Sequence, residues 1–342
     1  MNRYKSIKLD KTMYKGGGGF AARLEELDPS ADYRGTPLEG LDAYQRQLKR
    51  FDIRVSGPRS SPIEKFFATS DSAALFPEYV ARAVRQGMED GEVLSQILAS
   101  RTQIDSLDYR TICLDESAGS LEPRDVAEGG MIPRTDILLK ENLVHLRKRG
   151  RLLAASYEAL RFQRLDLFTV ALGRIGAYIA RSQLEDAVEV LIDGDGNEGT
   201  AATPIQTAGT ALAYADLVGL WKRFDGCRMD TLLAAPDMAA AILNLSEMKD
   251  PAAGLDFNAT GRLGTPMGAK LIKTSAVPDG TIIAMDSRCA LEMVTAGDVT
   301  VDYDKLIDCQ MERAAITSTA GFAKIFPQAV QVLELKPDST GG

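Results

Sequence analysis

The clearest pattern of apolar and polar positions runs from about residue 164 to 192, where apolar side chains recur every three or four positions. This spacing is typical of an amphipathic helix, and at a rise of ~1.5 Å per residue the segment would span roughly 40 Å. Glycines in Asp193–Gly199 can adopt the left-handed conformation of a C-terminal cap, so the helix is predicted to end there. Because Gly173 and Gly176 lower helix propensity in its interior, we expect a second backbone to cross closely at these positions.

Upstream of this long helix, the pattern predicts helical segments followed by a projecting hairpin. Helical spacing covers Phe76–Leu98, with Gly91 as a candidate break. Strand-like stretches follow at Ile104–Leu114 and from Met131 to about Leu153, and the polar, acidic segment Asp115–Gly130 connects them. A connection of this length is rare within a compact domain, and long projecting loops usually contact another molecule.

Downstream of the long helix, two further helices and several short strands are predicted. The helices cover Tyr214–Phe224 and Pro236–Met248, on either side of a buried strand at Met229–Ala235. Further strands are predicted at Ala269–Thr274, Thr281–Met285, Cys289–Val294, Val299–Tyr303, Ala314–Thr317 and Ala323–Leu335. Since strands and helices do not alternate regularly, the fold class is α+β, and neither a Rossmann sheet nor a TIM barrel is favoured.

Residues 1 to about 65 lack a sustained period and contain the glycine run Gly16–Gly19. We interpret this segment as an extended arm with a short amphipathic helix near Leu38–Phe51 and a flexible hinge at the glycines. Such an arm cannot bury enough apolar surface alone to offset its ordering entropy, so it must lie against something else. A neighbouring subunit is the expected partner. Whether its basic first residues touch DNA or keep the arm soluble stays open.

Composition and charge narrow the function classes. The chain has 342 residues, 45% hydrophobic and 26% charged, which suits a folded globular protein. Its net charge of −8 argues against a surface built to grip phosphates, so any nearby nucleic acid is not expected to be read by sequence. No apolar run of about 18 residues occurs, and no apolar signal segment follows the basic N-terminus. We therefore expect no membrane contact and synthesis in a cytoplasm.

The residue types that build metal and catalytic sites form no recognisable constellation. The cysteines lack a CxxC pair and are interpreted as reduced, mostly buried thiols. They are Cys113, Cys227, Cys289 and Cys309. His145 is the only histidine, and residues 193–197 have only part of the spacing of an EF-hand loop, which indicates a turn. We predict no catalytic residue, no cofactor, no metal and no enzyme activity.

Five stretches carry a resemblance to a known protein family. They are LFPEYVARAVRQGMEDGEVLSQILAS at 75–100, EGG at 128–130 followed by ILLKENLVHLRKRGRLLAASYEAL, LIDGDGNEGTAATPI at 191–205, GTPMGAKLIKTSAVPDGTIIAMD at 264–286, and GFAKIFPQAVQVLEL at 321–335. In this order they resemble the major capsid proteins of tailed double-stranded DNA bacteriophages, over roughly residues 65–335.

The resemblance implies the HK97-type capsid fold, an α+β fold with an N-terminal arm, an extended β-hairpin loop, a long spine helix, and peripheral and axial domains. The implied bounds are 1–69 for the arm, 70–101, 150–204 and 296–335 for the peripheral domain with its spine helix at about 164–192, 102–149 for the extended loop, 205–295 for the axial domain, and 336–342 for the C-terminal tail. The peripheral domain is therefore expected to be discontinuous in sequence.

The implied function is structural: self-assembly into pentamers and hexamers that form an icosahedral head around the double-stranded phage DNA. A portal protein is an implied partner, and a separate scaffolding protein, a maturation protease and a decoration protein stay open. The implied location is the virion capsid, assembled in the host cytoplasm. An encapsulin-type nanocompartment shell is the alternative. No lysine lies between Lys65 and Lys140, so an isopeptide cross-link through the extended loop is not expected.

Charged residues of the extended loop are the candidate contacts between subunits. Its acidic tip consists of Asp115, Glu116, Glu122, Asp125 and Glu128. Its basic base consists of Arg147, Lys148, Arg149 and Arg151. An acidic tip that meets the basic base of the next subunit would set register and partner choice in a closed shell. Ordinary solvated charges are the alternative interpretation.

Overall fold

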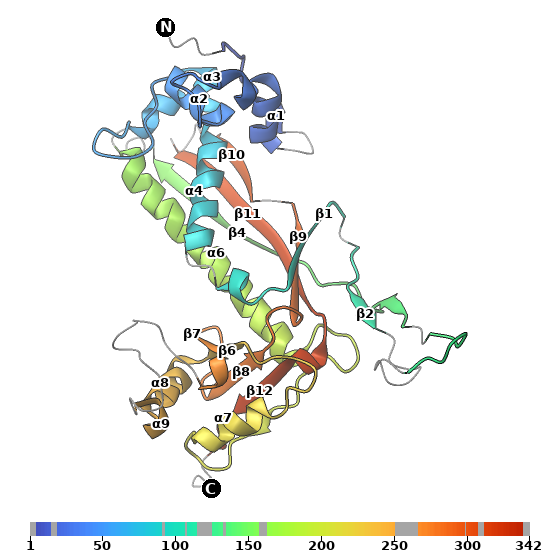
Figure 1. The fold of residues 1–342 in the computed structure, drawn as a ribbon. Coiled ribbons are helices and arrows are strands. Elements are labelled where there is room, and N and C mark those ends of the chain that lie inside the picture. Colours follow the sequence, from blue (N-terminus) through green and yellow to red (C-terminus); the bar gives the residue numbers. More distant parts are fainter. Residues whose placement is uncertain are drawn as a thin grey trace. The chain divides into compact units, whose positions relative to one another are not determined.

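The computed structural model describes residues 5–14, 19–90, 93–106, 108–114, 125–132, 135–156, 163–249, 266–297, 299–306 and 311–337 (Figure 1). The chain divides into two compact units. Unit 1 consists of Met1–Gly91, Lys148–Ala180 and Asp298–Ser318, and unit 2 consists of Glu92–Arg147, Arg181–Gly297 and Thr319–Gly342. Both units are discontinuous in sequence. The domain bounds that the resemblance implies follow a different division and stay a prediction.

The N-terminal helices belong to unit 1. They are α1 (Gly19–Leu27), α2 (Ala43–Arg50), α3 (Ser70–Ala73), α4 (Phe76–Asp90) and the first part of α6 (Leu165–Asp193), with short 3-10 helices at Lys11–Tyr14, Ser30–Tyr33 and Ile63–Phe67. The helices expected near 38–51 and 164–192 are confirmed, and the helix expected from Phe76 ends at Asp90, next to the candidate break. None of the helices in the described part of the chain is long and apolar enough to cross a membrane.

The N-terminal segment differs from the expected extended arm. Between residues 19 and 67 it folds into short helices whose apolar side chains share one core with α4 and α6 of the same chain. The core members from this segment include Phe20, Leu24, Tyr44, Leu48, Ile63 and Phe66. A buried ion pair joins Arg46 Nε to Asp28 Oδ2 at 2.9 Å. The expectation was wrong because each short helix contributes only a few apolar side chains to the core. The segment therefore shows no sustained hydrophobic period in the sequence, although its helices pack into one core.

Helices α4 and α6 cross at glycines, as the sequence predicts. A Cβ atom added to Gly176 would lie far inside van der Waals contact with the carbonyl oxygen of Val84, and one added to Gly87 would clash with the backbone of Gly173. The two backbones therefore approach as closely as they do only because no side chain separates them. Apolar residues on both sides of the crossing, among them Val84 and Leu172, are fully buried.

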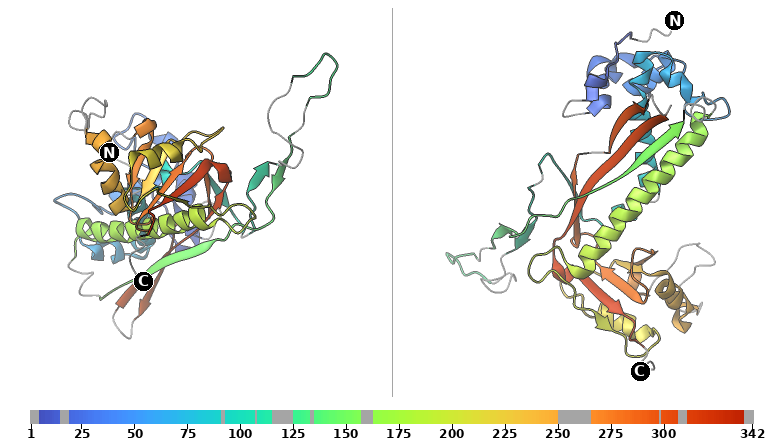
Figure 2. Two further views of the ribbon diagram at one scale, coloured as in Figure 1. Left: turned by 90° about the horizontal axis from the view of Figure 1, so that it is seen from below. Right: turned by 180° about the vertical axis from the view of Figure 1, so that it is seen from behind.

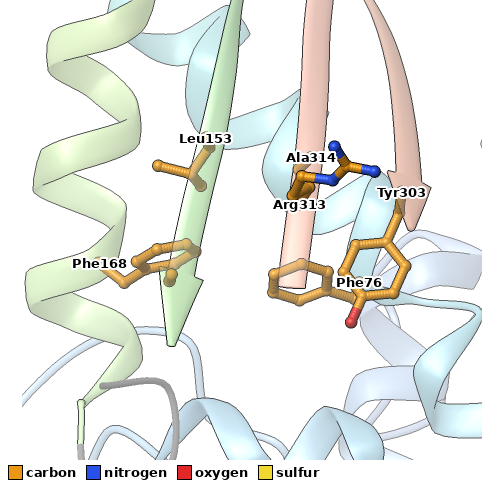
Figure 3. A pocket seen from close by; sticks show the side chains of 7 residues that line it. Phe76, Leu153, Phe168, Tyr303, Arg313 and Ala314 are labelled. Carbon is orange, nitrogen blue, oxygen red and sulfur yellow. The ribbon is translucent and has the colours of Figure 1, made fainter. Parts of the chain in front are cut away.

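Unit 1 also holds part of a sheet, in which β11 (Met311–Lys324) pairs with β4 (Arg147–Ser156) and, antiparallel, with β10 (Thr300–Leu306). Aromatic rings from α4, α6 and β10 gather beside these strands. A small, mostly apolar cavity lies among them, lined by Phe76, Leu153, Ala155, Phe168, Tyr303, Arg313 and Ala314. Figure 3 shows the Phe168 and Leu153 side chains on one side of this cavity and the Phe76 and Tyr303 rings on the other.

Unit 2 is centred on a second sheet, which carries its largest core (Figure 2). The strand order is β5 (Ile205–Gln206), β12 (Val330–Glu334), β8 (Thr281–Met285), β6 (Thr231–Ala234) and β7 (Lys270–Lys273). Every residue of β6 and β8 is buried, which agrees with their continuous apolar runs. The helices of this unit are α7 (Tyr214–Trp221), α8 (Pro236–Asn244), α9 (Ser246–Lys249) and the second part of α6. The strands expected at 229–235, 269–274 and 281–285 are confirmed.

A smaller group of strands in unit 2 joins β1 (Ser100–Ile104), β9 (Leu291–Ala296) and the end of β11. The single returning strand expected at Ala323–Leu335 is wrong. β11 ends at Lys324, a 3-10 helix covers Pro327–Ala329, and β12 then pairs with β8 in the other sheet. Pro327 explains the break, because proline fixes φ and lacks the backbone N–H that a continuing strand would need.

The glycine crossing predicts a difference between two glycine-to-alanine changes. Gly176→Ala should lower the free energy of unfolding by at least about 2 kcal/mol, because the added methyl group must push α6 away from α4. In the matched control Gly219→Ala on α7, nothing lies within 4 Å of the new Cβ, and alanine should stabilise the helix by about 1 kcal/mol. Urea unfolding of the unassembled chains measures both. Equal effects of the two changes would contradict the close crossing.

Candidate assembly surface

A two-stranded hairpin within unit 2 projects from the rest of that unit (Figure 2). Its strands are β2 (Ile112–Leu114) and β3 (Ile137–Leu139), paired antiparallel with Ile112 opposite Leu139. The expected hairpin is confirmed, although its strands are shorter than predicted. The first expected strand, Ile104–Leu114, divides into the end of β1 and β2, and the second divides into β3 and β4.

Most large apolar side chains of the hairpin are exposed. Met131 is 97% exposed, Ile132 79%, Ile137 67% and Leu139 64%. We call this set the hairpin apolar surface, and its members are Ile112, Val126, Met131, Ile132, Ile137, Leu138, Leu139 and Leu143. Because side chains alternate along a strand, Ile137 and Leu139 lie on one face together with Ile112 of the paired strand. Such a concentration of exposed apolar side chains marks an interaction site.

A buried carboxylate on β9 fixes the outgoing side of the hairpin. Glu292 is 5% exposed and accepts hydrogen bonds from Thr102 Oγ1 at 2.6 Å, Tyr109 Oη at 2.7 Å and Thr111 Oγ1 at 2.5 Å. Burial and the hydrogen bond to Glu292 raise the pKa of Tyr109, which stays a neutral donor. Three hydroxyl groups from one segment therefore satisfy one buried charge, and they hold the chain in place up to the start of β2.

A second buried carboxylate fixes the returning side. Lys140, directly after β3, places its Nζ 3.1 Å from Asp195 Oδ2, and the same oxygen accepts a hydrogen bond from the Lys324 amide at 3.1 Å. Lys140 Nζ also donates to the Lys324 carbonyl oxygen. Burial would raise the pKa of Asp195, but hydrogen bonds from Asn197 and the charge of Lys140 outweigh it and lower the pKa. Asp195 therefore remains charged and holds the returning strand.

The turn that follows α6 completes this attachment. Gly194 has a φ of +86°, and its amide donates to the Val190 carbonyl oxygen at 3.0 Å, so the helix ends where the glycines predicted. Asn142, which follows β3, binds this turn through two hydrogen bonds. Its side-chain Nδ2 donates to the Gly196 carbonyl oxygen at 2.6 Å, and its backbone N–H donates to Asn197 Oδ1 at 2.9 Å. The segment with partial EF-hand spacing is thus a helix-ending turn to which the hairpin is bound.

Lys324 lies beneath these contacts and is 1% exposed. Its Nζ donates to the carbonyl oxygens of Leu191 at 2.9 Å and Thr200 at 2.6 Å. Burial lowers the pKa of Lys324 to about 8, against the attraction of Asp195. Lys324 thereby joins the end of α6 to the end of β11. It stabilises the segment to which Lys140 of the hairpin is bound.

The candidate contact residues fall into three groups. Asp115, Glu116 and Glu122 lie outside the described residues. Asp125 and Glu128 are exposed next to Val126 of the hairpin apolar surface. On β4, Lys148 and Arg151 are exposed and Arg149 is half-buried. Arg147 differs from the expectation of a contact available to a neighbour. It pairs within its own chain with Asp186 at 2.6 Å and Glu189 at 2.5 Å, and these hydrogen bonds raise its pKa.

Sequence reasoning missed the buried ionic groups that hold the hairpin. A signal was present, because Glu292 and Lys324 are the charged residues within the otherwise apolar stretches Leu291–Val294 and Gly321–Phe326. A charge at such a position is rarely buried unless it is paired. The partner of each charge depends on strand register, which the sequence pattern does not specify.

Comparisons with known proteins agree with this architecture. Residues 140–308 match a family described as "Phage capsid protein". No curated protein matches the chain. Among solved structures, a virus-like particle from Pyrococcus furiosus is similar with a TM-score of 0.52 and 14% identity, covering 76% of this chain and 99% of that chain.

Two further solved structures are similar. The capsid of a native GTA particle has a TM-score of 0.52 and 18% identity, covering 71% of this chain and 90% of that chain. Gordonia phage Cozz has a TM-score of 0.51 and 12% identity, covering 72% of this chain and 87% of that chain. The solved structures show that the chain has the HK97-type fold, and together with the family match they support a structural role in a capsid shell.

The buried lysine predicts a pH dependence of stability. Folding lowers the pKa of Lys324 from its ordinary value of 10.5 to about 8. Below pH 8 the lysine is charged in both states, and the folded chain carries the cost of burying that charge. Between pH 8 and 10.5 the folded chain releases the proton first, so the free energy of unfolding rises with pH, by up to about 3 kcal/mol.

The measurement is urea unfolding of the unassembled chain and of Lys324→Met at several pH values. The difference in free energy of unfolding, parent minus variant, should increase from pH 8 to 10.5, because all other groups titrate in both proteins. Lys273→Met, which replaces an exposed lysine, is the control and should give a constant difference. A constant difference for Lys324→Met as well would show that Lys324 keeps an ordinary pKa.

Proposed function

We propose that copies of this chain assemble through pentamers and hexamers into the icosahedral head that encloses the double-stranded DNA of a tailed phage. The hairpin apolar surface is the observation that carries the proposal. A lone subunit exposes this surface to water, whereas two buried carboxylates hold the hairpin that presents it. An apolar surface on a fixed support suits a permanent contact with another subunit, since little ordering entropy remains to be lost on binding.

Charge favours a second copy of the same chain as the occupant. Asp125 and Glu128 lie beside the hairpin apolar surface, and Lys148 and Arg151 lie exposed on β4 of each chain. Opposite charges on one chain can pair between identical subunits in a ring, where each subunit offers both patches. Arg147 takes no part in this proposal, because Asp186 and Glu189 already bind it.

The phage head is favoured over an encapsulin-type nanocompartment by the description of the matching family and by the similarity to a Gordonia phage structure. The nanocompartment stays the second candidate, because the fold is also shared with a virus-like particle from Pyrococcus furiosus, whose description names no phage. The net charge of −8 suits a wall that encloses DNA without gripping it. Nuclease-treated particles from the source should release long double-stranded DNA. Particles that release a single folded cargo protein instead would favour the nanocompartment.

The remaining expectations belong to the same proposal. The chain would reside in the virion capsid and be assembled in the host cytoplasm. A portal protein would occupy one vertex, and a scaffolding protein, a maturation protease and a decoration protein are further candidate partners. The extended-loop, peripheral and axial bounds implied by the resemblance would describe the subunit in the shell.

The hairpin apolar surface predicts an assembly defect without a folding defect. The double change Ile137→Ser and Leu139→Ser removes two side chains of one hairpin face that are 67% and 64% exposed in the single chain. Loss of about 2 kcal/mol per contact should reduce the assembled fraction at least tenfold at a fixed concentration. Light scattering and electron microscopy measure assembly, and circular dichroism measures folding.

The control is Leu243→Ser on α8, a leucine that is 41% exposed outside the hairpin, which should assemble as the parent does. If the hairpin variant forms shells at the parental concentration, the hairpin does not carry the contact. If the hairpin variant fails to fold, Ile137 and Leu139 must stabilise the single subunit, which would contradict their exposure to solvent.

The charges predict a rescue experiment. Lys148→Glu with Arg151→Glu should weaken assembly, because each acidic tip would then face another acidic patch. Adding Asp125→Lys and Glu128→Lys to this variant should restore assembly, since the pairing is reversed but kept. Light scattering at low and high salt measures the effect, which should shrink as salt screens the charges. Normal assembly of the first variant, or no rescue by the second, would leave these residues as ordinary solvated charges.

A further inference from the structure

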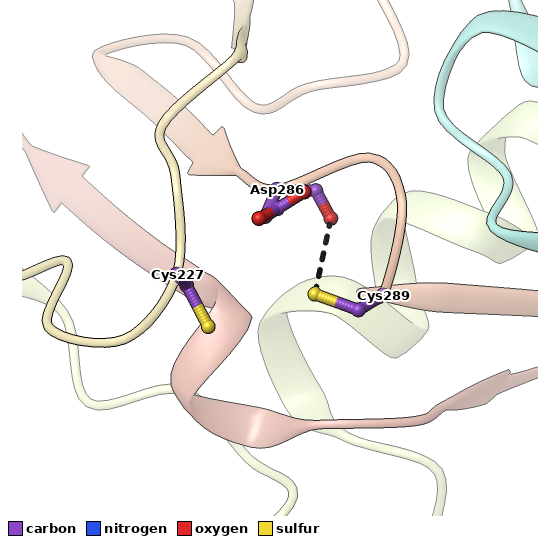
Figure 4. Close-up of side chains that lie close together, drawn as sticks. All are labelled: Cys227, Asp286 and Cys289. Atoms are coloured by element: carbon purple, nitrogen blue, oxygen red, sulfur yellow. Dashed lines mark hydrogen bonds between the residues drawn. The ribbon is translucent and has the colours of Figure 1, made fainter.

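Three side chains with metal-binding atoms lie together in unit 2, away from the hairpin contacts. They are Cys227, Asp286 and Cys289, and their ligand atoms all lie within 4.8 Å of one another (Figure 4). Cys227 belongs to the segment before β6, Asp286 follows β8 directly, and Cys289 lies in the turn before β9. Both thiols are half-buried, and neither forms a disulfide.

Strand register explains why residues so distant in sequence meet here. In the antiparallel pair of β6 and β8, Thr231 is opposite Met285. Cys227 and Cys289 each stand four positions beyond that pair, so the same register continued would place them opposite each other. The ladder ends before that point, but hydrogen bonds hold both segments. The Asp230 amide donates to the Met285 carbonyl oxygen at 3.1 Å, and the Cys289 amide to the Asp286 carbonyl oxygen at 3.2 Å.

The Asp286 carboxylate is 2% exposed and fixed from two sides. Backbone amides hold both of its oxygens, Arg228 N at 2.9 Å from Oδ2 and Arg288 N at 3.2 Å from Oδ1. The Arg288 guanidinium occupies the remaining positions, with Nε 2.9 Å from Oδ1 and Nη2 2.8 Å from Oδ2. The Arg288 side chain is 66% exposed, so it can leave into solvent while the amides keep the carboxylate in place.

We propose that these three residues form a binding site for a thiophilic divalent cation such as Zn²⁺, with Arg288 occupying the cation's place at Asp286 when no metal is bound. Two cysteine sulfurs and one carboxylate oxygen are ligand types that zinc takes in proteins. Tetrahedral coordination with Zn–S bonds of ~2.3 Å puts two sulfurs roughly 3.8 Å apart. Atoms that already lie within 4.8 Å need only small side-chain rotations to reach that geometry.

Binding would have a structural consequence. The two thiols would release their protons to solvent, and the metal would join the segment before β6 to the turn between β8 and β9. This cross-link would stabilise unit 2, because a metal that binds only the folded chain raises the free energy of unfolding. Three protein ligands leave a fourth position for water. The site is independent of shell assembly, so it can fail while the proposed function stands.

The experiment uses the full, reduced chain and Co²⁺ as a spectroscopic probe that Zn²⁺ displaces. We expect one Co²⁺ per chain, with the intense near-ultraviolet absorption of thiolate–cobalt bonds. Cys227→Ser and Cys289→Ser should each weaken binding at least about tenfold, which is the lower end of losses for a metal-site change. The matched control Cys113→Ser replaces the half-buried free thiol of the hairpin and should bind as the parent does.

Arg288→Ala provides the sharper result, because a structural role of the arginine would not produce it. If Arg288 competes with the metal for Asp286, its removal should tighten Co²⁺ binding several-fold and leave the thiolate absorption unchanged. Weaker binding by Arg288→Ala, absorption that depends on Cys113, or no thiolate absorption in the parent would overturn the proposal. The proposal would also be overturned if the reduced chain does not bind Co²⁺ but is oxidised by a low-molecular-weight disulfide to form a Cys227–Cys289 disulfide.

Discussion

The proposed assembly depends on two buried carboxylates, Glu292 and Asp195, which hold the two sides of the hairpin. Glu292 accepts hydrogen bonds from Thr102 on β1 and from Tyr109 and Thr111 just before β2, and Asp195 pairs with the Lys140 ammonium just after β3. Removing partners from a buried charge is costly, and detaching the hairpin would take two hydroxyl donors from Glu292 and the ammonium from Asp195. These ionic contacts thereby fix the orientation of the hairpin, whose own apolar side chains are mostly exposed.

Because the hairpin is fixed, its exposed apolar side chains are held in position for a contact with another subunit. Met131 and Ile132 are largely exposed in the single chain, and the proposed contact in a closed shell would bury the same side chains in every subunit. Each contact can be weak, because a closed assembly sums many copies of it. The charges beside the surface would then select register, and the capsid family and HK97-type fold are consistent with this division of roles.

The sequence predicted the long helix, its glycine crossing, the hairpin and the buried strands of unit 2, because each depends on local spacing or on a glycine requirement. It failed at the N-terminal segment, where short helices with few apolar residues each share one core, and at Pro327, where one apolar run divides between two sheets. It also missed the pairs Lys140–Asp195 and Cys227–Cys289. Those depend on register between distant strands, which no local pattern records.

A cryo-electron microscopy reconstruction of particles formed by the chain would test the central claim most directly. The account predicts closed shells in which the hairpin apolar surface, Ile137 and Leu139 included, is covered by a neighbouring copy. It also predicts that the Glu292 and Asp195 contacts are intact in every subunit. Closed shells in which Ile137 and Leu139 face solvent, or in which the hairpin has left Glu292 and Asp195, would contradict it.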